Sequence, residues 1–176
     1  MKSIKFIAKH GFRHNDVKPQ NFLVRRLDHE TRVYLSDFGF EGGKAGGTPL
    51  FASPECFLGT EVEFSDVFSL GSTFLYCLMT PANFRWTLAI PVDHELDDVM
   101  KRLNDAMDLI PLMGLIQQMV EPNPMSRPRI DEVLQFLQNT NLDNLDQFKV
   151  DMNVALRKSY VNGCSQEFVV HMEAVE

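Results

Sequence analysis

Three side chains that can do chemistry together stand within six residues near the start of the chain. They are the carboxylate of Asp16, the amine of Lys18 and the amide of Asn21. An acceptor, a cation and an amide on one short turn can hold a hydroxyl, a phosphate and a metal ion. Because Pro19 fixes its own φ and forces Lys18 into an extended conformation, residues 13–21 are predicted to form a loop.

Regular elements are predicted on both sides of this loop. Residues 4–10 have the pattern of the end of a helix, which Gly11 terminates. Two apolar runs, 22–26 and 32–36, flank a polar turn and are predicted to form a hairpin. A buried helix is predicted from Ser65, as its N-cap, to Thr80, before Pro81. Further helices are predicted at 94–108, 111–120, 130–137 and 145–160.

Composition limits the class of protein. The chain has 176 residues, 44% of them hydrophobic, which is enough for one domain with its own core. Its net charge of -7 argues against a nucleic-acid partner. No Cys-x-x-Cys pair, secretory leader or bilayer-spanning apolar run is found. We therefore expect a soluble protein inside the cell, in the cytoplasm, that does not bind membranes.

Several short motifs follow the loop in a fixed order, and their order is more specific than any one of them. They are Asp37-Phe38-Gly39, Gly47-Thr48-Pro49 running on to Ser53-Pro54-Glu55, Asp66 to Gly71, and Pro124 to Pro128. With these motifs, residues 3–140 resemble the C-terminal (large) lobe of a eukaryotic serine/threonine protein kinase. The resemblance implies a mainly α fold with a short β-hairpin beside the catalytic loop.

The resemblance also implies roles for the chemical groups. Asp16 would orient the hydroxyl of a protein substrate, and Lys18 would neutralise the phosphate in transfer. Asn21 and Asp37 would hold Mg²⁺ on the phosphates of ATP. Leu23 would belong to the hydrophobic floor beneath the nucleotide. The cofactors implied are thus ATP and Mg²⁺.

Other residues of the motifs would support the site. By the same resemblance, Thr48 would face the substrate and touch Asp16, and Asp66 would accept backbone N–H bonds from the catalytic loop. Glu55 and Arg127 would form a buried ion pair. His14, Phe38 and Gly39 complete the supporting set, Gly39 by allowing a sharp turn after the preceding motif residues.

The sequence departs from the family pattern in three ways. Asn15 stands where most regulated kinases carry arginine, and residues 40–47 hold no hydroxyl, so control by a phosphate there is not expected. No glycine-rich loop and no strand lysine precede the catalytic loop, so we expect the small β-rich lobe to be absent. The predicted domains are a large lobe at 1–140 and a helical extension or tail at 141–176.

Two interpretations of function remain open. One is a serine/threonine kinase domain that lacks the part gripping ATP. The alternative is a pseudokinase-like binding module, or a truncated isoform, which docks a partner protein on the exposed small-lobe side around Leu23. A kinase for small molecules is disfavoured by the Asp66 and Glu55–Arg127 elements.

Overall fold

The computed structural model describes residues 2–38, 47–60, 64–79 and 111–140. The chain divides into two compact units, one made of Met1–Leu78 and Ile110–Thr140 and the other of Met79–Leu109 and Asn141–Glu176. The described helices and strands all belong to the first unit. The predicted helices at 94–108 and 145–160 lie outside the described residues, and a domain boundary at 140 stays a prediction.

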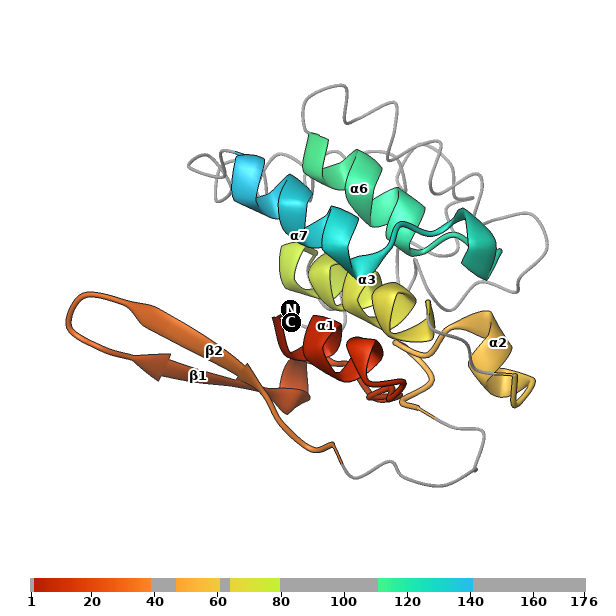
Figure 1. Ribbon diagram of the computed structural model, residues 1–176, viewed down its shortest axis with the longest axis horizontal. Coiled ribbons are helices and arrows are strands. Elements are labelled where there is room, and N and C mark those ends of the chain that lie inside the picture. Colours follow the sequence, from red (N-terminus) through yellow and green to blue (C-terminus); the bar gives the residue numbers. More distant parts are fainter. Residues whose placement is uncertain (1, 39–46, 61–63, 80–110, 141–176) are drawn as a thin grey trace, which may run out of the picture. The chain divides into compact units, whose positions relative to one another are not determined.

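The described elements are mostly helical, with one two-stranded sheet, as the sequence predicts (Figure 1). They are, in chain order, α1 Lys2–Lys9, the 3₁₀ turn η1 Pro19–Asn21, β1 Phe22–Arg26, β2 Thr31–Leu35, α2 Pro54–Phe57, α3 Ser65–Leu78, α6 Pro111–Met119, the 3₁₀ turn η2 Pro124–Ser126 and α7 Ile130–Asn139.

Helix α3 is the centre of the first unit. It lies against α6, and Gly71 allows the two helices to approach closely. A Cβ at Gly71 would lie 2.8 Å from Met119 Cβ and 2.9 Å from Val120 Cγ1. The core around α3 draws on the loop, the hairpin base and three other helices. It contains Ile4, Val17, Leu35, Val67, Leu70, Leu115, Met119 and Val133.

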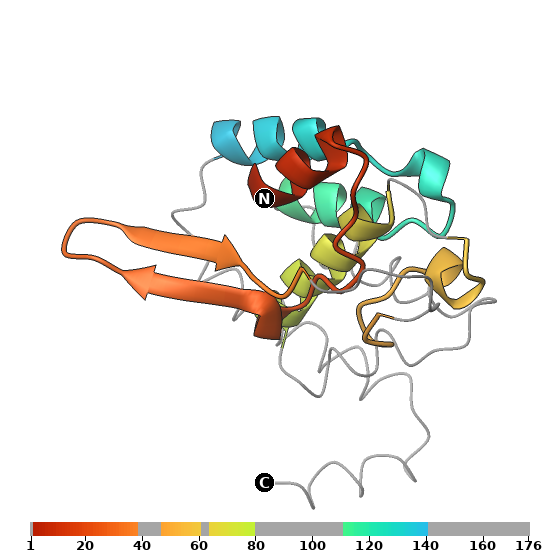
Figure 2. The same ribbon diagram turned by 60° about the horizontal axis from the view of Figure 1, so that its bottom comes forward.

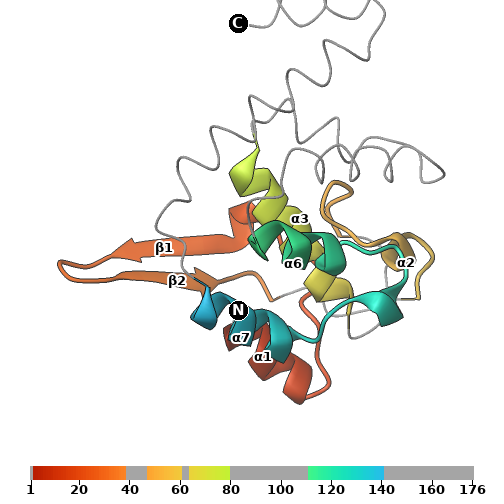
Figure 3. The same ribbon diagram turned by 90° about the horizontal axis from the view of Figure 1, so that it is seen from above.

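Helix α1 ends at Lys9, one residue before the predicted end, and Gly11 terminates it as predicted. Gly11 has a φ of +76°, which L side chains rarely adopt. Its N–H donates to Ala8 O at 3.0 Å, and the N–H of Phe12 donates to Ile7 O at 3.0 Å. This pair of bonds is a Schellman motif, so the glycine terminates the helix and turns the chain into the catalytic-type loop. Helix α1 packs against α7 (Figure 3).

The hairpin extends away from the helices (Figures 1 and 2). Strand β1 pairs antiparallel with β2, from Phe22 opposite Leu35 at the base to Arg26 opposite Thr31 near the turn. The prediction placed the second strand at 32–36, one residue too late, because Ser36 is used in side-chain and backbone bonds to the loop.

The predicted N-cap of α3 is wrong by one residue. The carbonyl of Phe64, not of Ser65, accepts the N–H of Phe68 at 3.2 Å, so α3 begins at Ser65. The hydroxyl of Ser65 instead donates to Glu55 Oε1 at 2.8 Å. Helix α3 is described to Leu78, and its predicted end at Thr80 lies outside the described residues.

Candidate active site

The loop before β1 has the conformation that its proline predicts. Lys18 is extended, with φ −154° and ψ 162°, and Pro19 opens the 3₁₀ turn η1. The N–H of Asn21 donates to Lys18 O at 3.0 Å and closes this turn. The turn brings Lys18 and Asn21 back toward Asp16.

Asp16 is the buried hub of the loop. Its Oδ1 accepts the N–H of Thr48 at 3.1 Å and the hydroxyl of Thr48 at 2.8 Å. Its Oδ2 lies 2.7 Å from Lys18 Nζ and accepts Asn21 Nδ2 at 3.3 Å. Burial alone would raise the pKa of Asp16, but the bonds from Lys18 and Thr48 outweigh it and lower the pKa below its ordinary value. The carboxylate is therefore held ionised.

Thr48 connects the segment that begins at Gly47 to Asp16 and Lys18 of the loop before β1. Its hydroxyl also accepts a bond from Lys18 Nζ at 2.8 Å, so Asp16, Lys18 and Thr48 are mutually bonded. Gly47 makes this contact possible, because a Cβ there would lie 2.7 Å from Asn15 O. The expected contact between Thr48 and Asp16 is present.

Asn21 and Asp37 each carry a side-chain oxygen without a partner in the part of the chain that the structure describes. Asn21 Nδ2 donates to the backbone O of Asp16 at 2.8 Å, which leaves Asn21 Oδ1 unpartnered among the described residues. The N–H and the hydroxyl of Ser36 both donate to Asn21 O, at 2.8 and 2.9 Å, so Asp37 directly follows a residue tied to Asn21.

The Asp37 carboxylate is exposed, and it too has no hydrogen-bond or ion-pair partner in the described parts of the chain. An amide oxygen and a carboxylate are ligands that suit Mg²⁺, which takes few protein ligands and completes its shell with water and phosphate. No group of three His, Cys, Asp or Glu side chains that could hold a metal occurs among the described residues.

His14 connects the catalytic-type loop to the segment around Asp37. Its Nε2 bonds to Ser36 O at 2.9 Å, and its Nδ1 accepts the N–H of Asp16 at 3.3 Å. Because one partner only accepts and the other only donates, the ring carries its proton on Nε2. The ring of Phe38 meets the His14 ring at 4.9 Å between centroids. His14 is among the residues predicted from the sequence, but Ser36 is not, because its only signal is a hydroxyl directly ahead of Asp37.

Asp66 holds the loop from the opposite side. Its Oδ2 and Oδ1 accept the backbone N–H groups of His14 and Asn15, at 2.7 and 2.8 Å, as expected from the sequence. Deep burial raises the pKa of Asp66, while these two bonds act to lower it. Asn15, held by one of these bonds, has a φ of +61°.

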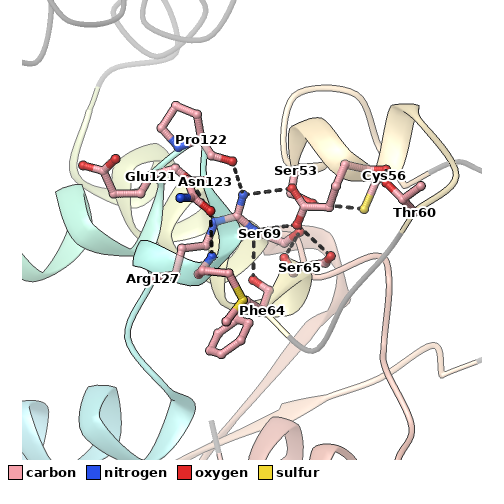
Figure 4. Close-up of polar contacts among 12 residues, drawn as sticks. Ser53, Cys56, Thr60, Phe64, Ser65, Ser69, Glu121, Pro122, Asn123 and Arg127 are labelled. Atoms are coloured by element: carbon pink, nitrogen blue, oxygen red, sulfur yellow. Dashed lines mark hydrogen bonds and ion pairs between the residues drawn. The ribbon is translucent and has the colours of Figure 1, made fainter.

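Glu55 and Arg127 form the expected buried ion pair. Figure 4 shows the surroundings of Arg127, among them Phe64, Glu121 and Pro122. Arg127 Nη1 donates to Glu55 Oε1 at 2.5 Å, and Arg127 Nη2 donates to Glu55 Oε2 at 2.9 Å. The same guanidinium donates to the backbone carbonyls of Phe64, Glu121 and Pro122. The pair thus joins α2, the start of α3 and the segment before η2.

The remaining predicted residues are placed as follows. Leu23 is 57% exposed on β1, two residues beyond Asn21. Gly39 lies outside the described residues. Within the parts of the chain that the structure describes, no helix has the length and apolar character needed to cross a bilayer.

Comparison with known proteins agrees with this geometry. A family model described as the protein kinase domain matches residues 1–137. The ovarian-specific serine/threonine-protein kinase Lok of Drosophila melanogaster is 29% identical over 76% of this chain and 31% of its own length. The dual specificity protein kinase shkC of Dictyostelium discoideum is 31% identical over 75% of this chain and 28% of its own length.

A third similar protein is the carbon catabolite-derepressing protein kinase of Saccharomyces cerevisiae. It is 28% identical over 86% of this chain and 24% of its own length. The chain therefore spans less than a third of the length of each of these three relatives.

Proposed function

This chain belongs to the protein kinase family, and we propose that it carries the catalytic-loop region of a serine/threonine kinase, which transfers phosphoryl from ATP to a protein hydroxyl. The observation that carries the proposal is the bonded set of Asp16, Lys18 and Thr48, with Asn21 bonded to the same carboxylate. Phosphoryl transfer depends on positioning and charge stabilisation, and this set supplies both.

Asp16 is the residue that would receive the substrate. Its pKa is lowered, so it remains an ionised acceptor that can orient a hydroxyl and take up its proton. Lys18 would balance the negative charge that develops on the phosphoryl oxygens. Lys18 is followed by Pro19, as in serine/threonine kinases. The hydroxyl of Thr48 donates to Asp16 and lies beside the position of the substrate hydroxyl in this proposal.

Asn21 Oδ1 and the Asp37 carboxylate would hold the metal ion, since both oxygens are free of protein partners among the described residues. Bound Mg²⁺–ATP would supply the phosphoryl group together with neutralisation of its charge. Leu23, exposed on β1, would offer an apolar surface to the base of the nucleotide.

A phosphotransfer assay tests this proposal. The purified chain is incubated with labelled ATP, Mg²⁺ and a generic protein substrate, and incorporation is compared with that of Asp16→Ala. The matched control is Asp28→Ala, which removes a carboxylate from the hairpin turn, outside the site. We expect Asp16→Ala to lower the rate by about a hundredfold or more, and Asp28→Ala to leave it unchanged. Equal incorporation in all three proteins would reject the proposal.

A second candidate is a non-catalytic module that docks a partner protein around Leu23. It is favoured by the exposure of apolar residues on the hairpin, where Leu23, Val24, Val33 and Tyr34 are all accessible. Size-exclusion chromatography with light scattering, with and without added nucleotide, distinguishes the two functions. A complex between the chain and a partner protein that forms equally well with the wild type and with Asp16→Ala would support the docking function, provided that the wild type shows no phosphotransfer.

A further inference from the structure

The outer half of the hairpin is the most exposed regular structure in the described part of the chain. Phe22 and Leu35 anchor its base, but the paired residues Val24 and Val33 are 60% and 57% exposed. A two-stranded hairpin without cover is marginally stable in water. Its outer half is therefore a surface that gains stability from a bound partner.

The register gathers a particular set of side chains on one face. Leu23 lies opposite Tyr34, and Arg25 lies opposite Arg32. Because side chains alternate between faces, these four share one face, which we term the arginine face. Arg26, between them in sequence, belongs to the other face.

Charge on the arginine face is only partly balanced. Arg32 Nε donates to Glu30 Oε1 at 2.8 Å, and Arg32 Nη2 lies 2.5 Å from the same oxygen. Arg25 has no polar partner in the residues that the structure describes. Like charges directly opposite one another destabilise an antiparallel pair, so the free hairpin bears an unfavourable arrangement that an anionic group would relieve.

We propose that the arginine face binds an extended acidic segment of a partner protein. The pairs Leu23–Tyr34 and Arg25–Arg32 are two residues apart along each strand, about 7 Å. An extended segment that presents an apolar side chain over the first pair would present the residue two positions later over the second. The recognised pattern is thus an apolar residue, any residue, then aspartate or glutamate.

Other occupants fit this face less well. A second copy docked about a two-fold axis would bring two more arginines to this face and, from these four residues, no acidic side chain. Nucleic acid is disfavoured because the chain as a whole has a net charge of -7, which repels phosphate backbones beyond this small patch. The arginine face shares Leu23 with the proposed nucleotide floor, but Arg25 and Arg32 belong to no predicted catalytic or metal-binding set. Variants of these two arginines therefore test the peptide contact separately from phosphoryl transfer.

Fluorescence anisotropy with designed peptides tests the proposal. One labelled peptide repeats valine-serine-glutamate-serine, which puts valine and glutamate on one face of a strand. The second repeats valine-glutamate-serine-serine, which has the same composition but puts them on opposite faces. We expect the first peptide to bind about threefold to tenfold tighter, and its affinity to fall as salt is raised.

Substitutions in the chain show which arginines bind the peptide. Arg25→Gln and Arg32→Gln should each weaken binding of the first peptide by about threefold to tenfold. Arg26→Gln, on the same strand but the opposite face, should weaken it less than about twofold. Circular dichroism checks that each variant is folded.

Three results would overturn the proposal. They are equal affinity for the two peptides, equal losses for Arg25→Gln and Arg26→Gln, and tighter binding of a labelled oligodeoxythymidine than of either peptide. The second result would mean diffuse electrostatic attraction, and the third would mean a nucleic-acid surface.

Discussion

The buried pair of Glu55 and Arg127 offers the sharpest test of how the site is held together. The side chain of Arg127 is 0% exposed and that of Glu55 is 9% exposed. Replacing Glu55 by glutamine removes the negative charge but keeps one acceptor, so the guanidinium of Arg127 stays buried without a counter-charge. Breaking a buried pair from one side costs about 3–5 kcal/mol, and we expect Glu55→Gln to cost about 3 kcal/mol.

Urea unfolding followed by far-UV circular dichroism measures this cost. With an m value of about 1–3 kcal/mol/M, a loss of about 3 kcal/mol moves the midpoint down by about 1–3 M. The matched control is Lys5→Met, which breaks the ion pair with Asp131, whose side chains are 51% and 59% exposed. Exposed pairs contribute about 0–1 kcal/mol, so the control should shift little.

The result that would refute this reasoning is a loss for Glu55→Gln no larger than that for Lys5→Met. If Glu55→Gln does not fold, Arg127→Lys provides the comparison, because it keeps the charge but cannot donate to both carboxylate oxygens and the carbonyls at once. The double variant Glu55→Met with Arg127→Met should recover part of the loss, since it leaves no unpaired charge.

The same pair predicts a pH dependence of stability. Burial alone would raise the pKa of Glu55, but hydrogen bonds from Arg127, Ser53 and Ser65 help to lower it from 4.5 to about 2. A carboxyl whose pKa is lowered by folding stabilises the fold above its unfolded pKa. Wild-type stability should therefore fall as the pH drops from about 4.5 toward 2. A Glu55→Gln protein with the same slope in this range would contradict the assignment.

Two further predictions follow from single contacts. Gly71→Ala should destabilise the fold by about 1–3 kcal/mol, because the new Cβ would collide with α6. Gly114→Ala has open space around its Cβ and should stabilise α6 by about 0.5–1 kcal/mol. Thermal unfolding of both variants checks this prediction, and equal shifts would contradict it. Thr48→Val should raise the pKa of Asp16, since the substitution removes a hydroxyl bond that lowers this pKa, whereas Thr48→Ser keeps the hydroxyl and should not. NMR titration of the Asp16 carboxyl carbon measures the shift. The same pKa in both variants would refute the prediction.

Local backbone chemistry accounts for the parts of the fold that the sequence predicts best. A glycine with a φ of +76° at the end of α1 and a proline that forces Lys18 to extend act within a few residues. The contacts of Asp16 with Thr48 and of Glu55 with Arg127 join distant residues, and only the resemblance to protein kinases indicated them.

The parts that the sequence did not predict depend on tertiary contacts. Serine is a residue type preferred at N-caps, but the hydroxyl of Ser65 donates to the buried carboxylate of Glu55, and the cap position falls on Phe64. The apolar run places Ser36 in the predicted strand, but the end of a strand is set by its pairing. The bonds of Ser36 to Asn21 leave no sign in the apolar pattern of the sequence. The short helix α2 has too few residues to carry a periodic signal.

The most direct test of the account is whether Asn21 and Asp37 hold a divalent metal with the nucleotide. Electron paramagnetic resonance of Mn²⁺, a substitute for Mg²⁺, reports free and bound metal while ATP is added to the chain. We predict that ATP increases metal binding to the wild type and to Asp28→Asn, and that Asp37→Asn abolishes the increase. Nucleotide-dependent binding that is the same in Asp37→Asn as in the wild type, or absent from all three proteins, would contradict the account.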